Sequence, residues 1–123
     1  MAPRRRAPVP AGAELTVVLV DARNVLRSRW PNIPEDELVR RTAEWAEREG
    51  VDAVVVFDGP APDIDAGVRV VGTGNESADD WIAREAARST PYWLVTSDRE
   101  LRERAGGAAD RVIGGGTFAS LLT

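Results

Sequence analysis

The chain has 123 residues, 43% of them hydrophobic and 29% charged, which is the composition of one soluble globular domain. It contains no cysteine and no histidine, and all 16 basic residues are arginine. This composition excludes a disulfide scaffold, a thiolate zinc site, a histidine-based catalytic triad and a lysine Schiff base. Any catalysis must rest on carboxylates, hydroxyls, arginines or a metal ion with oxygen ligands.

The charge is unevenly distributed along the chain. Residues 1–13 contain Arg4, Arg5 and Arg6 and no acid, whereas residues 14–123 contain 13 arginines and 20 acidic residues, a net charge of −7. We interpret residues 1–13 as a disordered basic arm and residues 14–123 as a single folded domain. The arm either contacts phosphates or is a solvated tail. No apolar run is long enough to span a membrane or to form a signal peptide, so we expect a cytoplasmic protein.

Short apolar runs alternate with helical patterns along the folded part. Runs rich in β-branched residues predict buried strands at 15–20, 52–58, 68–72, 92–96 and 111–114. Periodicity and capping signals predict helices at 35–49, 77–88, 97–105 and 117–122, with a short helix or turn around 24–29. Strands that are apolar throughout and alternate with helices indicate the α/β class, with a parallel sheet covered on both faces.

Acidic residues follow four of the predicted strands. Asp21 directly follows the first strand, and Asp58 directly follows the second. The helix after the third strand opens with Glu76 and Asp79, and Asp98 lies just beyond the fourth. Because parallel strands end at the same edge of a sheet, we expect these acids to share one cleft. Clustered carboxylates repel one another unless a cation neutralises them, and oxygen-only ligands suit Mg²⁺ or Mn²⁺.

Two of the helix starts fit capping boxes. Ser77 with Asp80, and Ser97 with Glu100, have the spacing of an N-cap and its reciprocal acid. We therefore assign Asp80 and Glu100 structural roles, which leaves the acids at positions 79 and 98 free for a ligand. Asp58 precedes a Gly-Pro pair and fits a turn role as well as a functional one.

The order of these motifs resembles the NYN domain of the PIN-like nuclease superfamily, and within it the YacP-like bacterial ribonucleases. The resemblance extends from about residue 15 to the end of the chain, and it is carried by VDARNVL at 20–26, VVVFDG at 54–59, NESADDWI at 75–82, TSDREL at 96–101 and GGGTF at 114–118. It implies a three-layer α/β/α sandwich with a parallel five-stranded sheet in the order 3-2-1-4-5. The first and fourth strands would then be neighbours.

The resemblance also implies a metal-dependent ribonuclease that hydrolyses RNA phosphodiesters, with endonucleolytic cleavage as the expected mode. Matched by motif, Asp21, Asp79 and Asp98 are the catalytic acids that hold Mg²⁺ or Mn²⁺. Glu76 is a further metal ligand at the margin of that site, and Asp58 is an additional candidate acid.

Three further residues are assigned to substrate binding. Asn24 matches the asparagine of the family's opening motif and would orient Asp21 or a phosphate. Ser97 and Arg23 stand beside the matched acids, and we assign them to the same role.

Two other interpretations compete with a nuclease. The acidic body and small size favour a non-catalytic PIN-like module that binds RNA or a protein without cutting. A small-ligand domain of the flavodoxin or response-regulator type would need a phosphate-binding loop or a late lysine, and the chain has neither. Homo-oligomerisation, association with the ribosome and the identity of the RNA target stay open.

Overall fold

The structure of the chain is a computed structural model that describes residues 15–28, 33–89 and 91–122. Residues 1–14, and with them the predicted basic arm, lie outside the described residues. Strands and helices alternate in the order β1 (Val17–Asp21), α1 (Ala22–Ser28), α2 (Glu35–Glu49), β2 (Asp52–Phe57), β3 (Arg69–Gly72), α3 (Ala78–Ala86), β4 (Tyr92–Val95), α4 (Arg99–Ala105), β5 (Arg111–Ile113) and α5 (Gly115–Leu121). Within these ranges, no helix is long and apolar enough to cross a bilayer.

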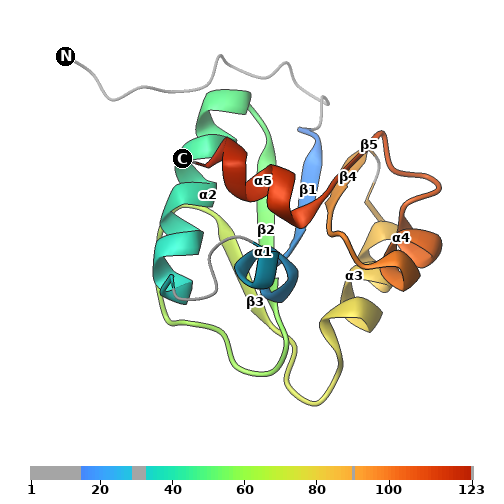
Figure 1. Ribbon diagram of the computed structural model, residues 1–123, viewed down its shortest axis with the longest axis horizontal. Coiled ribbons are helices and arrows are strands. Elements are labelled where there is room, and N and C mark those ends of the chain that lie inside the picture. Colours follow the sequence, from blue (N-terminus) through green and yellow to red (C-terminus); the bar gives the residue numbers. More distant parts are fainter. Residues whose placement is uncertain (1–14, 29–32, 90, 123) are drawn as a thin grey trace.

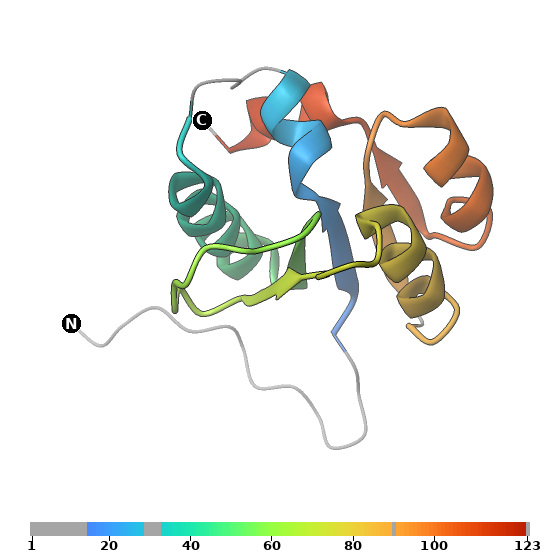
Figure 2. The same cartoon turned by 90° about the horizontal axis from the view of Figure 1, so that it is seen from below.

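The five strands form one sheet in the order β3-β2-β1-β4-β5, and every neighbouring pair is parallel. In the central strand, Val17 lies opposite Asp52 of β2 and Tyr92 of β4. Helices α1, α2 and α5 cover one face, and α3 and α4 cover the other (Figures 1 and 2). The predicted three-layer sandwich and its strand order are therefore confirmed.

The core lies in two layers because successive strand residues point to opposite faces of the sheet. On the side of α1, α2 and α5, Val18 and Val20 of β1 pack in one cluster with Trp45 and Phe118. The two aromatic rings meet edge to face with centroids 4.9 Å apart. On the side of α3 and α4, Leu19 is the buried residue that β1 contributes to the other cluster. Burial on both faces explains why the central strand β1 is apolar up to Asp21.

Helix α2 has the boundaries that the sequence predicts. Pro34 precedes it in an extended conformation, and its first turn carries three acidic side chains, which favours a helix N-terminus. Gly50 ends it in the left-handed region with φ of 70°, where the absence of a Cβ removes the steric cost. The side chains of Leu38, Thr42 and Trp45 are buried on its inner face.

Helices α1 and α5 approach each other closely at one glycine. A Cβ atom at Gly115 would lie 2.7 Å from Oγ of Ser28 and 3.1 Å from the carbonyl oxygen of Asn24, and it would overlap Oδ1 of Asn24. The Gly115 N–H donates to Oγ of Ser97 over 2.8 Å. Only a residue without a side chain fits here, so this contact fixes the position of α1 against the end of the sheet.

We expect Gly115→Ala to lower the free energy of unfolding by about 1–3 kcal/mol, because the added methyl group overpacks the contact between α1 and α5. Gly107→Ala is the matched control, since a Cβ atom at that glycine meets nothing within 4 Å. Urea unfolding of both variants measures the difference. Equal stability of the two would contradict the close approach of α1 and α5.

Candidate active site

A cleft of about 320 Å³ opens at the carboxyl edge of the sheet, where β1, β2 and β4 end. Figure 2 views the molecule from this side. The lining residues come from the strand ends, from α1 and from the starts of α3 and α4, and they are Asp21, Arg23, Asn24, Arg27, Asp58, Ser77, Asp79 and Asp98. The sequence expectation that the acids following the first, second, third and fourth strands share one cleft therefore holds for Asp21, Asp58, Asp79 and Asp98.

Asp21 is the buried acid of the cleft, with 6% of its surface exposed. Its Oδ2 accepts a hydrogen bond from the Thr96 hydroxyl over 3.0 Å. Burial raises the pKa of Asp21 to about 6, the Thr96 hydroxyl opposes that shift, and the negative charge of Asp79 adds to it. Burial and the nearby negative charge both destabilise the ionised carboxylate of Asp21. Binding a cation or a proton would relieve this cost.

Thr96 is a residue of the candidate site that the sequence analysis did not single out. It is fully buried between two of the acids, and its hydroxyl both donates to Asp21 and accepts the Asp98 N–H over 3.1 Å. The signal was present, since Thr96 directly follows the end of β4 and immediately precedes the Ser97-Asp98 pair. Its hydroxyl therefore holds the Asp21 carboxylate close to the turn at Asp98 that follows β4.

The N-cap of α4 is Asp98, which corrects the predicted capping box of Ser97 and Glu100. Oδ1 of Asp98 accepts the Leu101 N–H over 2.9 Å. Ser97 does not cap because its hydroxyl accepts the Gly115 N–H instead. Asp98 therefore has a structural duty that the sequence reasoning did not assign to it, although its side chain also lines the cleft.

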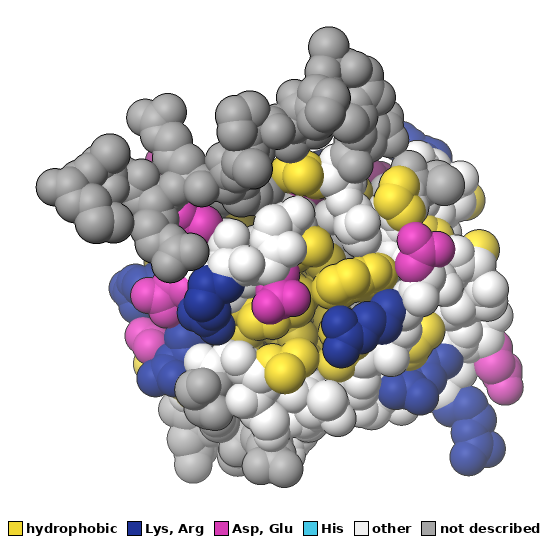
Figure 3. Space-filling view, turned by 90° about the horizontal axis from the view of Figure 1, so that it is seen from above, with side chains coloured by type: hydrophobic (Ala, Val, Ile, Leu, Met, Phe, Trp, Pro, Cys, Tyr) yellow, Lys and Arg dark blue, Asp and Glu magenta, His cyan; other side chains and the backbone are white. Residues whose placement is uncertain are grey.

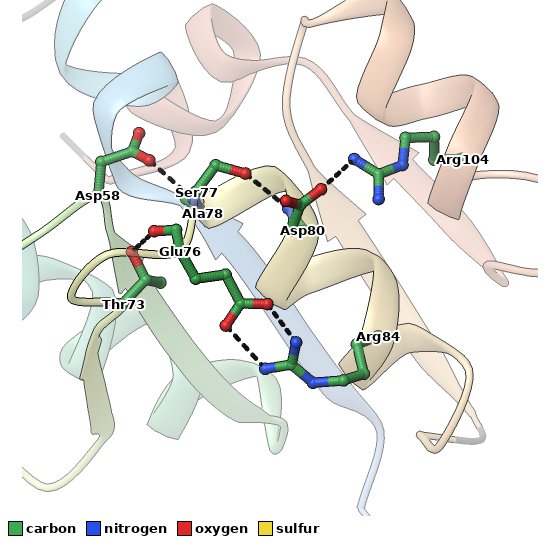
Figure 4. Close-up of polar contacts among 8 residues, drawn as sticks. All are labelled: Asp58, Thr73, Glu76, Ser77, Ala78, Asp80, Arg84 and Arg104. Carbon is green, nitrogen blue, oxygen red and sulfur yellow. Dashed lines mark hydrogen bonds and ion pairs between the residues drawn. The ribbon is translucent and has the colours of Figure 1, made fainter.

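Three polar side chains with different roles lie at the start of α3, and Figure 4 shows two of them, Ser77 and Asp58. Ser77 is the N-cap, as predicted, and its Oγ accepts the Asp80 N–H over 3.0 Å. Oδ1 of Asp58 accepts the Ala78 N–H over 2.7 Å, which ties the end of β2 to this helix. The Asp79 side chain has no hydrogen bond or ion pair with another described residue, and burial, followed by repulsion from Asp98 and Asp58, raises its pKa.

Glu76 lies apart from the other acids. Both of its carboxylate oxygens contact the Arg84 guanidinium on the outer side of α3 (Figure 4), and this pairing lowers the pKa of Glu76. It is absent from the cleft lining, so the structure does not bring it to the predicted metal site. Asp80 pairs with Arg104 of α4 over 2.9 Å, and this bridge between helices is a structural role, as predicted, but a different one from the reciprocal acid of a capping box.

Two of the three predicted substrate-binding residues make hydrogen bonds that join elements of the fold. Oδ1 of Asn24 accepts the Ser97 N–H over 2.8 Å, and Ser97 in turn holds Gly115. Asn24 and Ser97 therefore join α1, the turn after β4 and α5. Arg23 is exposed, and its guanidinium lies 3.7 Å from Asp58, which is a long ion pair.

A larger hollow, of about 670 Å³, lies away from this cleft. It is bounded by α2, the start of β2 and the loop before β3. Figure 3 shows the side of the molecule where the strands begin, with apolar side chains gathered between charged ones. The hollow shares no lining residue with the carboxylate cleft, and none of the predicted site residues lies in it. The smaller cleft, which is lined by the predicted acids, is therefore the candidate active site.

We expect Asp21→Asn to stabilise the protein at neutral pH but not in acid. The pKa of Asp21 is raised to about 6 in the folded state, so the folded state binds this proton more tightly than the unfolded chain does. The stabilisation from protonated Asp21 is complete below about pH 4 and is lost as the pH rises through 6. In EDTA, the gain in unfolding free energy should be near zero at pH 4 and roughly 2–3 kcal/mol at pH 7.5.

The exposed Asp110 supplies the control for this measurement. Asp110→Asn should change the free energy of unfolding by only a few tenths of a kcal/mol, because its side chain is exposed to solvent. A pH-independent effect of Asp21→Asn in urea unfolding would contradict the burial of its charge.

No protein-family model matches the sequence, and no curated protein matches it. Among solved structures, the chain is similar to the crystal structure of a point mutant of Rae1 (YacP) from Bacillus subtilis. The TM-score is 0.71 and the identity 23%, over 88% of this chain and 75% of that chain. The chain therefore has the fold of Rae1 (YacP), which agrees with the fold that the order of its motifs indicated.

Proposed function

We propose that the chain is a metal-dependent ribonuclease that hydrolyses RNA phosphodiesters at the carboxylate cleft. The observation that carries the proposal is the meeting of Asp21, Asp79 and Asp98 in one cleft, with the first of them buried. An arrangement of like charges that costs folding free energy is typical of a functional site. The fold shared with Rae1 (YacP) supports the same class of activity by analogy.

The donor set fits a hard divalent cation. Asp21, Asp79 and Asp98 offer only carboxylate oxygens, which Mg²⁺ and Mn²⁺ prefer. In the described part of the chain, no group of three or more acidic side chains is arranged to hold an ion directly. Mg²⁺ commonly keeps several of its waters and needs only one or two carboxylates in direct contact. We therefore assign Asp21, Asp79 and Asp98 as the residues that would hold a hydrated ion.

Each acid contributes differently to the reaction. When bound, the ion would supply a polarised water and neutralise the negative charge that grows on the phosphate. Asp21, held by Thr96, provides a fixed and desolvated carboxylate at the floor of the cleft. Asp79 has the smallest structural role of the three, because its side chain makes no hydrogen bond or ion pair with another described residue. Asp98 keeps one oxygen on the Leu101 N–H, which holds its carboxylate in place.

A non-catalytic RNA-binding module is the second candidate. The observation that favours it is that Asp58 and Asp98 both serve helix N-termini, so these acids have a structural reason to be present. Cleavage assays separate the two candidates.

We expect the purified chain to cleave labelled single-stranded RNA in Mn²⁺ or Mg²⁺ and to lose this activity in EDTA. Asp79→Asn should abolish cleavage and leave the unfolding free energy equal or higher, because it relieves repulsion from Asp98 and Asp58. Mn²⁺ should raise the melting temperature of the parent chain more than that of the variant. Cleavage by Asp79→Asn at the parental rate would refute the assignment.

Ser77→Ala separates the helix cap from the catalytic acid. We expect it to lower the unfolding free energy by about 0.5–2 kcal/mol, because the Asp80 N–H loses its acceptor. Its effect on the cleavage rate should be much smaller than that of Asp79→Asn. A variant of full stability and no activity would reverse the two roles.

A further inference from the structure

A second hollow adjoins the carboxylate cleft. Its volume is about 400 Å³, and it is lined by Arg23, Leu26, Arg27, Glu35, Phe57 and Asp58. Three of these residues, Arg23, Arg27 and Asp58, also line the carboxylate cleft. Helix α1 therefore forms a wall common to the two hollows, and a ligand at the carboxylates can extend over α1 into the second one.

The two arginines on this wall are open to an anionic ligand. Arg23 and Arg27 lie one turn apart on α1 and are both exposed. Among the described residues, Arg23 has only the 3.7 Å contact with Asp58, and Arg27 makes no ion pair. By contrast, Arg84 and Arg104 lie in close pairs with acids of their own. The acidic cleft needs cations beside it to accept a phosphodiester, and α1 supplies them.

Helix α1 is also held rigidly, which a binding wall requires. Its residue Asn24 accepts the Ser97 N–H, and Gly115 packs against the backbone and side chain of the same asparagine. The side chains of Ala22 and Val25 are buried against the sheet. The two arginines therefore project from a fixed element.

The second hollow suits a nucleobase better than another phosphate. Leu26 and Phe57 are its apolar lining residues. Phe57 is buried, whereas Leu26 is half-buried, so part of the Leu26 side chain is accessible to a ligand. Glu35 and Asp58 add carboxylates, which repel a phosphate but accept N–H groups from the edge of a base. The volume lies within the range of small-ligand pockets.

We propose that this hollow and the α1 wall together hold one unpaired nucleotide of an RNA substrate, with Arg23 and Arg27 on its flanking phosphates and its base in the hollow. The proposal rests on the proposed function and names the substrate class as single-stranded RNA, because only an unstacked base can enter. Glu35 selects the base. Guanine presents two adjacent N–H donors to a carboxylate, whereas uracil presents mainly acceptors, so guanine is preferred.

Binding rather than cleavage tests the proposal. The probes are fluorescein-labelled uridine decamers, with and without one central guanosine, and a duplex of the same length. The protein is the full chain carrying Asp79→Asn in Mg²⁺, so that the probe stays intact, and fluorescence anisotropy gives Kd across a salt series. Arg27→Gln is matched with Arg48→Gln, and Glu35→Gln with Glu49→Gln; both controls lie in the exposed last turn of α2.

We expect Arg27→Gln to weaken binding of the single-stranded probes about fivefold and to lower the salt slope by about 0.7, the value for one phosphate contact. Arg48→Gln should change neither quantity. The guanosine probe should bind about tenfold more tightly than the uridine probe, as expected for a hydrogen bond to a charged group. Glu35→Gln should remove that preference, and Glu49→Gln should keep it.

Several results would overturn the proposal. The role of α1 would be refuted by equal affinities of Arg27→Gln and Arg48→Gln. The role of Glu35 would be refuted by a guanosine preference that persists in Glu35→Gln. Binding of the duplex as tight as that of the single strand, or no RNA binding at all, would refute the proposed nucleotide site. Failure of the proposed function gives a different pattern, in which the unmodified chain does not cleave RNA while the effects of Arg27→Gln and Glu35→Gln on binding persist.

Discussion

Parallel pairing of β1 with both β2 and β4 is the constraint on which the site depends. Strands that run in one direction end at one edge, so the acids that follow them in sequence must meet there. Asp21 and Asp98 are 77 positions apart in the chain, yet the hydroxyl of Thr96 contacts both the carboxylate of the first and the N–H of the second. The folded sheet therefore holds these carboxylates close to one another, and their negative charges repel. In the unfolded chain they would lie far apart.

Backbone N–H groups offset part of that repulsion. The carboxylate of Asp58 accepts an N–H at the start of α3, and that of Asp98 accepts one at the start of α4. Helix N-termini carry partial positive charge, so both acids are stabilised where they stand. Consequently, the structural and chemical roles of Asp58 and Asp98 are difficult to separate by mutation. Asp79 has no such duty to another described residue, which makes its carboxylate the clearest probe of chemistry at this edge.

Charge also decides how a polyanion can approach. The body of the domain is acidic, and several of its arginines already have partners. Arg84 and Arg104 pair with acids, and Nε of Arg102 donates to the Thr96 carbonyl. Helix α1 differs, because Arg23 has only a long ion pair with Asp58 among the described residues, and both Arg23 and Arg27 line the cleft. The helix itself is held by contacts of Asn24 and Gly115. Cations on a fixed helix beside carboxylates allow a phosphate to be oriented as well as attracted.

The sequence by itself determined the α/β class, the approximate bounds of the elements and the acids that share the cleft, because these follow from local periodicity and from positions at strand ends. It did not determine which helix-start residue caps α4. Ser97 and Asp98 both have capping chemistry, and only the Gly115 N–H, brought in by α5, occupies the serine hydroxyl and leaves the cap to Asp98. Likewise, Glu76 has the same charge as its neighbours, and its removal from the cleft depends on the turn that directs it towards Arg84. In both cases, side chains of similar chemistry take different roles because of the groups that lie within hydrogen-bonding distance of them. Only the folded chain brings those groups together.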